Sequence, residues 1–260
     1  MSIKEKINFK VYGILFTAAL FGAAAIIPYI LILQKSNIVK SGLSIEAFIG
    51  ITILQTTINI AILLFLGLLM IHTTGFKIPY ITALANREKI KDSFSEIFTM
   101  PAFLGITAGI LIIAGDFIFK KFGIAIKADI ETIAWWKGFL ASFYGGIVEE
   151  ILIRLFLMTL IIWIIMKVTQ ATIASPKKTI IWIAIIGAAL VFGAAHLPAV
   201  AALTKVTPSL VTRTLVLNGI GGIIFGWLFW KRGLEAAMIS HFSADIIIHV
   251  ITPLIGKAVS

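Results

Sequence analysis

Residues 133–166 read IAWWKGFLASFYGGIVEEILIRLFLMTLIIWIIM, and this stretch decides the class of fold. About 20 consecutive apolar residues are enough to cross a bilayer as a helix. At ~1.5 Å per residue, this stretch would extend about 50 Å as one helix, against a hydrocarbon thickness of about 30 Å. It is too short for two spans and a turn. We therefore predict one long helix that is tilted or kinked, with charged residues near its centre.

Six further apolar runs are long enough to span a membrane as helices: residues 11–33, 48–71, 100–119, 179–203, 209–230 and 234–254. The first follows a basic N-terminus, as a signal peptide does, but it is too long for a cleaved segment and is predicted to be retained. The sequence thus predicts an all-α polytopic membrane protein with seven transmembrane helices, or eight as the alternative, around a polar cavity. Because neither a repeat nor a low-complexity linker interrupts it, we predict a single domain over residues 1–260.

The amino-acid composition is typical of a protein whose surface faces the lipid bilayer. Of the 260 residues, 60% are hydrophobic and only 13% are charged, whereas soluble domains carry roughly 25% charged residues. The absence of cysteine removes disulfides, thiolate metal sites and cysteine nucleophiles. These values exclude a soluble enzyme, a disordered chain and a secreted disulfide scaffold.

The net charge is +10, but the positions of the basic residues are typical of anchors at a membrane surface and not of a nucleic-acid-binding face. Most basic residues lie in short loops between apolar runs, so no nucleic-acid partner is expected. Lys and Arg are more frequent at the N-terminus and in the loops after the second, fourth and sixth runs than on the opposite side. This bias predicts an integral protein of the cell membrane with its N-terminus in the cytoplasm.

Two local patterns concern packing and the bilayer surface. Gly105-x-x-x-Gly109 and Gly222-x-x-x-Gly226 predict close helix–helix approach. Charged and apolar residues alternate at helical spacing over residues 87–98, which predicts an amphipathic helix leading into the third span. A solvated helix without lipid contact is the alternative there.

The informative residues are ionisable side chains inside the apolar runs, since each is costly there unless it is paired, hydrated or functional. They are Asp116, Glu149, Glu150, Arg154, His196, Arg213, His241, Asp245 and His249. We expect Arg213 to snorkel, that is, to extend its charged group toward the membrane surface. For His249 we expect a structural contact.

Three groups of these residues form motifs in separate runs: E-E-x-x-x-R at 149–154, F-x-x-x-H at 192–196 and H-x-x-x-D at 241–245. Glu150 and Arg154 are four residues apart and are predicted to pair along one helix face. Glu149 lies about 100° around the axis and is free to face another helix. A single buried Glu–Arg pair is most often an internal salt bridge, but several ionisable groups on three helices favour a functional site.

In this order the motifs resemble those of the type II CAAX prenyl endopeptidases and their bacterial relatives, the CPBP or Abi family of intramembrane proteases. The resemblance covers about residues 135–250, including Gly226-Trp227-Leu228-Phe229-Trp230 ahead of the last motif. It implies a membrane-embedded endopeptidase whose substrate is a membrane-associated or prenylated peptide or protein.

The resemblance also implies roles for individual residues. Glu149 resembles the catalytic glutamate, activating a water with help from His196, and His241 and Asp245 occupy the positions attributed to oxyanion stabilisation. Glu150, Arg154 and Phe192 are the supporting residues, with Phe192 expected to pack and shape the cavity.

Asp245 leaves two alternatives open, because an ionised carboxylate accepts hydrogen bonds and cannot donate to an oxyanion. Either Asp245 is protonated, or it orients His241, which then donates alone. A third reading is a divalent metal held by Glu149, His196, His241 and Asp245. Since the H-E-x-x-H zinc signature is absent, we expect no cofactor.

Two functions from other classes also account for buried Glu and His residues. One is a proton-coupled transporter that uses Glu149, His196 and His241 as a relay. The other is a catalytically silent membrane adaptor, in which replacing Glu149 or His241 leaves the biological role intact.

Overall fold

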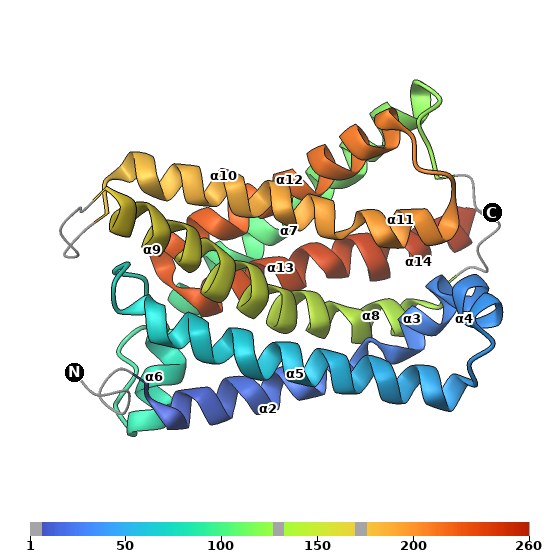
Figure 1. Ribbon diagram of the computed structural model, residues 1–260. Helices are drawn as coiled ribbons and strands as arrows, with labels where there is room; N and C mark the ends of the chain where they lie inside the picture. The colour runs from blue at the N-terminus through green and yellow to red at the C-terminus, as the bar shows by residue number, and fades with distance from the viewer. Residues whose placement is uncertain (1–6, 127–132, 170–175, 260) are drawn as a thin grey trace.

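The structure is a computed structural model that describes residues 7–126, 133–169 and 176–259, and these residues form helices joined by short connections (Figure 1). Lys4 and Lys6, which contribute to the predicted charge bias, lie outside the described residues. The helices are α2 (Phe9–Ala25), α3 (Ile27–Leu33), α4 (Lys35–Ser41), α5 (Ile45–Ile71), α6 (Pro79–Asn86), α7 (Phe94–Lys121), α8 (Trp135–Phe143), η1 (Tyr144–Glu149), η2 (Ile151–Met158), α9 (Thr159–Val168), α10 (Lys178–Ala195), α11 (Leu197–Leu203), α12 (Pro208–Arg232), α13 (Leu234–Asp245), η3 (Ile246–Ile251) and α14 (Thr252–Val259).

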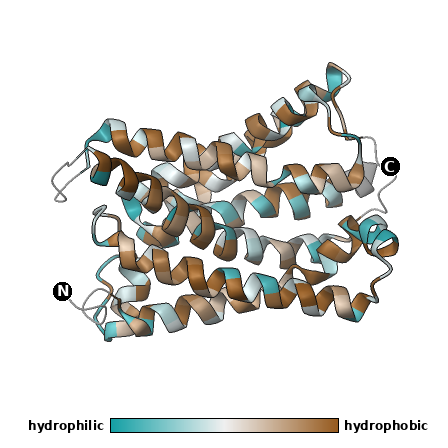
Figure 2. Ribbon diagram, viewed as in Figure 1, coloured by the Kyte–Doolittle hydropathy of each residue, from teal (hydrophilic) through white to brown (hydrophobic). Residues whose placement is uncertain are grey.

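The predicted membrane fold is confirmed. Within the described residues, 6 helices are long and apolar enough to cross a membrane, or up to 7 if α2 and α3, which are bent by 42°, form one span. Each corresponds to one of the seven apolar runs, and no helix supports an eighth span in this part of the chain. Large apolar side chains such as Leu54 and Phe103 point outward, and apolar residues extend along the long helices in Figure 2. Such a surface is solvated by lipid rather than by water.

The fourth run forms the single long helix that its length predicts, Trp135–Val168. It lies inside the bundle, against α2, α5, α10 and α13 (Figure 1). Its central part differs from the expected α-helix, because η1 and η2 are π-helical on either side of Glu150. π-Helical turns are rare and are often found at functional sites. The altered winding changes the direction in which the central charged side chains point.

Both small-residue motifs pack as predicted. A Cβ atom on Gly109 would lie 2.9 Å from the Cβ of Ile247, and one on Gly222 would lie 2.7 Å from the Cβ of Ala189. These glycines therefore let α7 approach the last span and α12 approach α10. Close contact with α7 fixes the position of the segment that carries the third motif.

The helix expected over residues 87–98 is wrong in position. The helix before the third span is α6, and it ends at Asn86, because the next residue, Arg87, has a left-handed φ of 59°. The next helix begins only at Phe94, because Ser93 and Glu96 form a capping box that sets its start. The periodic pattern of charges therefore spans a helix end, a loop and a helix start, which an alternation of residue types does not distinguish.

Candidate active site

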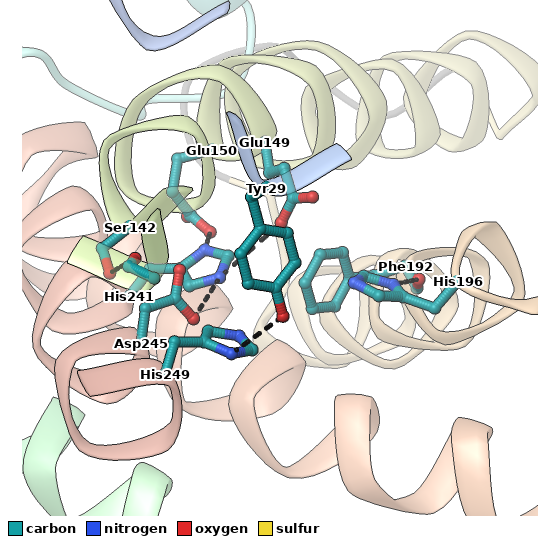
Figure 3. Close-up of polar contacts among 10 residues, drawn as sticks. Tyr29, Ser142, Glu149, Glu150, Phe192, His196, His241, Asp245 and His249 are labelled. Carbon is teal, nitrogen blue, oxygen red and sulfur yellow. Dashed lines mark hydrogen bonds and ion pairs between the residues drawn. The ribbon is translucent and has the colours of Figure 1, made fainter. Parts of the chain in front are cut away.

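The three motifs lie on separate helices that meet inside the bundle (Figure 3). Glu149 ends η1 and Arg154 lies within η2, so both belong to the π-helical centre of the fourth span. His196 follows the last residue of α10, and His241 and Asp245 lie in α13. Segments far apart in the sequence thus contribute to one group of polar side chains.

His241 is the centre of this group. Its Nδ1 lies 2.8 Å from Glu150 Oε1, and its Nε2 lies 3.6 Å from Glu149 Oε2 and 3.7 Å from Asp245 Oδ1. The carboxylate oxygen of Glu150 accepts, so Nδ1 donates the hydrogen bond. Three carboxylates therefore surround one imidazole ring, each approaching a ring nitrogen.

The two adjacent glutamates have different environments. The Glu150 side chain is fully buried, whereas 23% of the Glu149 side chain is exposed. Glu150 Oε2 lies 3.3 Å from Arg154 Nε, as the spacing predicts, and its other oxygen binds His241. Glu150 is therefore held from two sides, while Glu149 is partly exposed. The sequence did not predict the contact between Glu150 and His241.

Aromatic rings hold the charged groups in place. The His241 ring stacks on Phe225 of α12, with ring centroids 4.6 Å apart and an interplanar angle of 21°. Arg154 is fully buried, and its guanidinium lies over Phe192 at 5.2 Å and over Phe225 at 5.7 Å. Phe192 thus packs as expected. Phe225 has no signal in the sequence, since it is one phenylalanine among many in an apolar run.

His196 is oriented by the backbone of its own helix. Its Nδ1 lies 2.8 Å from the carbonyl oxygen of Phe192, while its backbone N–H bonds to Gly193. A carbonyl oxygen only accepts, so Nδ1 donates, and Nε2 of the neutral ring is left with its lone pair. The F-x-x-x-H spacing therefore also has a structural consequence. It places the backbone carbonyl of Phe192 beside the His196 ring, which fixes the proton of the neutral ring on Nδ1. Among the described residues, no ion pair joins His196 to Glu149.

Two residues outside the predicted site join this group. The Tyr29 hydroxyl of α3 lies 3.2 Å from Nδ1 of His249, which belongs to η3. Their rings are 5.5 Å apart in an edge arrangement. Tyr29 belongs to no motif, so the sequence alone offered no reason to select it.

Asp116 and Arg213 form a separate ion pair between α7 and α12. Nε of Arg213 donates to Asp116 Oδ1 at 3.0 Å, and Lys120 contacts the other oxygen at 2.8 Å. The sequence did not predict this carboxylate partner for Arg213, for which snorkelling was the expectation. This cluster is not among the side chains around His241.

The alternative reading of this site as a divalent metal centre requires several ligand side chains that converge on one point. In the part of the chain that the structure describes, no group of three or more His, Cys, Asp or Glu side chains is arranged to hold a metal ion. Glu149, His241 and Asp245 approach each other through His241 instead.

Comparison with known proteins agrees with these motifs. Residues 131–247 match the family model described as Type II CAAX prenyl endopeptidase Rce1-like. The match includes all three motifs, begins after Tyr29 and ends before His249. No curated protein and no solved structure matches the chain. Over residues 131–247 the chain is therefore similar to the Rce1-like, type II CAAX prenyl endopeptidases.

Proposed function

We propose that this protein is an intramembrane endopeptidase that hydrolyses a peptide bond with a water molecule activated by Glu149. The observation that carries the proposal is the contrast between the two glutamates, since Glu150 is buried and held by Arg154 and His241 while Glu149 is partly exposed. One carboxylate is occupied by structural contacts, and its neighbour is free to take a proton.

Glu149 and His196 are the two bases in the proposed reaction. Glu149 removes a proton from water, and the Nε2 lone pair of His196 orients that water by accepting its other hydrogen. The oxygen attacks the scissile carbonyl carbon, and the C=O electron pair moves onto the carbonyl oxygen. The oxyanion then re-forms the C=O bond as the C–N bond breaks, the electrons of the broken bond remain on nitrogen, and Glu149 returns the proton to the leaving amine.

His241 is proposed to stabilise the oxyanion. Its Nδ1–H donates to Glu150, and its Nε2 faces the carboxylates of Glu149 and Asp245. A lone pair at Nε2 would repel both, so we assign a proton there, available to a developing oxyanion. Asp245 then orients His241 by charge, which is the second of the two alternatives that the sequence left open.

The substrate is proposed to be a membrane-associated or prenylated protein, in keeping with the family. The chain is an integral membrane protein, and its N-terminus is proposed to lie in the cytoplasm. No metal is assigned a role in the proposed reaction.

The proposal is tested with the full chain purified and reconstituted in liposomes. Farnesylated peptides and matched peptides without the farnesyl group are incubated with it, and products are identified by mass spectrometry, with and without a metal chelator. Cleavage at one bond that persists with the chelator is the expected result. Proton-driven flux without cleavage would favour the transporter, absence of both would favour the adaptor, and activity lost to chelation and restored by a divalent ion would favour the metal site.

Gly145 provides a prediction about spacing within the site. A Cβ there would lie 3.1 Å from His241 Nε2 and still closer to Asp245 Oδ2. Gly145→Ala should displace both side chains and lower kcat by about 100-fold, because a shift of about 1 Å has such effects. The control is Gly13→Ala, where nothing lies within 4 Å of the added atom. Equal activity of both variants would contradict the proposed arrangement.

A further inference from the structure

Tyr29 reaches the polar group from the first span, outside the family match. It lies in α3, directly after the 42° bend that separates α3 from α2. In Figure 3 its side chain overlaps that of Glu149, with His241 to its left and Phe192 and His196 to its right. The bend therefore brings a residue of the N-terminal part of the chain to the proposed site.

The position of the Tyr29 hydroxyl is set by His249. The two side chains are joined by a hydrogen bond of 3.2 Å, and His249 itself is packed tightly against α8. A Cβ on Gly138 would lie 2.9 Å from the Cβ of His249. Because the close packing beside Gly138 restricts the movement of His249, the hydrogen bond to His249 also fixes the position of the Tyr29 hydroxyl.

Two features link this pair to the proposed catalytic residues. His249 follows Asp245 by four residues, where α13 continues into η3. Figure 3 shows the His249 ring below Asp245 and the Tyr29 hydroxyl directed at the His249 ring. The pair therefore borders the polar group rather than packing elsewhere in the bundle.

The proposed reaction needs hydrogen-bond donors for the oxyanion, and few groups around the site can supply them. Ionised Glu149, Glu150 and Asp245 only accept. The Nδ1–H groups of His241 and His196 are already engaged by Glu150 and the Phe192 carbonyl. Among the described side chains labelled in Figure 3, the Ser142 hydroxyl donates to the Gly138 carbonyl, which leaves the Nε2–H groups of His241 and His249 and the hydroxyl of Tyr29 as donors. Of these, the Tyr29 O–H can turn to a substrate by rotation about its C–O bond.

We propose that Tyr29 is a catalytic residue that donates a hydrogen bond from its hydroxyl to the oxyanion of the tetrahedral intermediate. This inference rests on the proposed function. In the resting state the phenol O–H donates to Nδ1 of His249, and during attack it rotates to the carbonyl oxygen of the substrate. The proton stays on Tyr29 throughout, and His249 acts as a positioning residue through it.

The test replaces the hydroxyl and leaves the ring. Tyr29→Phe in the reconstituted full chain should lower kcat by about 100-fold while KM changes by less than about twofold, as expected when a transition-state donor is removed. The matched control is Tyr12→Phe, because Tyr12 lies in α2 of the same bent pair and its hydroxyl donates to the Ala61 carbonyl at 3.2 Å. That variant should keep both kinetic constants.

A second variant separates catalysis from folding. His249→Phe should lower kcat with little change in KM, and the double variant with Tyr29→Phe should be no slower than Tyr29→Phe alone, since both act through one hydroxyl. If Tyr29→Phe does not fold, His249→Phe carries the test. Losses that multiply in the double variant would overturn the positioning role of His249.

Two outcomes distinguish this inference from the function on which it rests. If the unmodified chain cleaves its peptide and Tyr29→Phe cleaves it equally fast, the role of Tyr29 is overturned and the proposed function stands. If the unmodified chain cleaves no peptide, the proposed function is overturned together with the role of Tyr29.

Discussion

Replacing Glu149 by Gln is expected to lower kcat by about 10³-fold, because an amide cannot take the proton of the attacking water. The side chain keeps its shape, and Gln can still contact His241 Nε2, which lies 3.6 Å from Glu149 Oε2 in the native protein. Peptide binding does not need the carboxylate, so KM should change little. The measurement is kcat and KM for the cleaved peptide in liposomes.

The control for this change is Glu46→Gln on the exposed start of α5, which removes a carboxylate of the same kind that takes part in none of the contacts around His241. It should leave both constants unchanged. A Glu149→Gln protein that keeps more than about one tenth of the native kcat would contradict the role of Glu149 as general base.

Replacing Arg154 by Met is expected to lower the free energy of unfolding by about 3–5 kcal/mol, since it removes one of the two cations beside the buried carboxylate of Glu150 and leaves Oε2 of that carboxylate without a partner. Arg154 and Glu150 are both fully buried, 3.3 Å apart between Nε and Oε2. The guanidinium also fills the space between Phe192 and Phe225. A lower midpoint of thermal unfolding in detergent, together with loss of cleavage, is the expected result.

The double variant Glu150→Gln with Arg154→Met provides the control, because neither charge remains. The new amide oxygen at position 150 can still accept a hydrogen bond from His241 Nδ1. The double variant should therefore unfold at a higher temperature than Arg154→Met alone. If its midpoint were equal or lower, loss of packing rather than an unpaired charge would explain the effect of Arg154→Met.

The sequence predicted the fold well because the bilayer imposes length and apolarity on every span. The long fourth span and the small-residue contacts of Gly109 and Gly222 followed from the same reasoning. The segment 87–93 was misjudged, because the left-handed conformation of Arg87 and the cap at Ser93 end and restart the helix within a periodic pattern. The π-helical turns around Glu150 were also missed, since they arise from packing between helices that one segment does not reveal.

The polar group was predicted in part. The spacing of Glu150 and Arg154 gave their contact, because four residues place two side chains on one helix face. The contact between Glu150 and His241 depends on how α13 packs against the fourth span, and the contact between Tyr29 and His249 depends on the bend after α2. Such contacts join residues far apart in the chain, and neither residue type nor local spacing encodes them.

The most direct test of Glu149-activated hydrolysis follows oxygen atoms through a single turnover in ¹⁸O-labelled water, with enzyme in excess over peptide. Attack by water predicts ¹⁸O in the new carboxylate of the peptide product and none in the side chain of Glu149. Labelled Glu149 with unlabelled product would show that the carboxylate itself attacks the peptide, which would contradict the account.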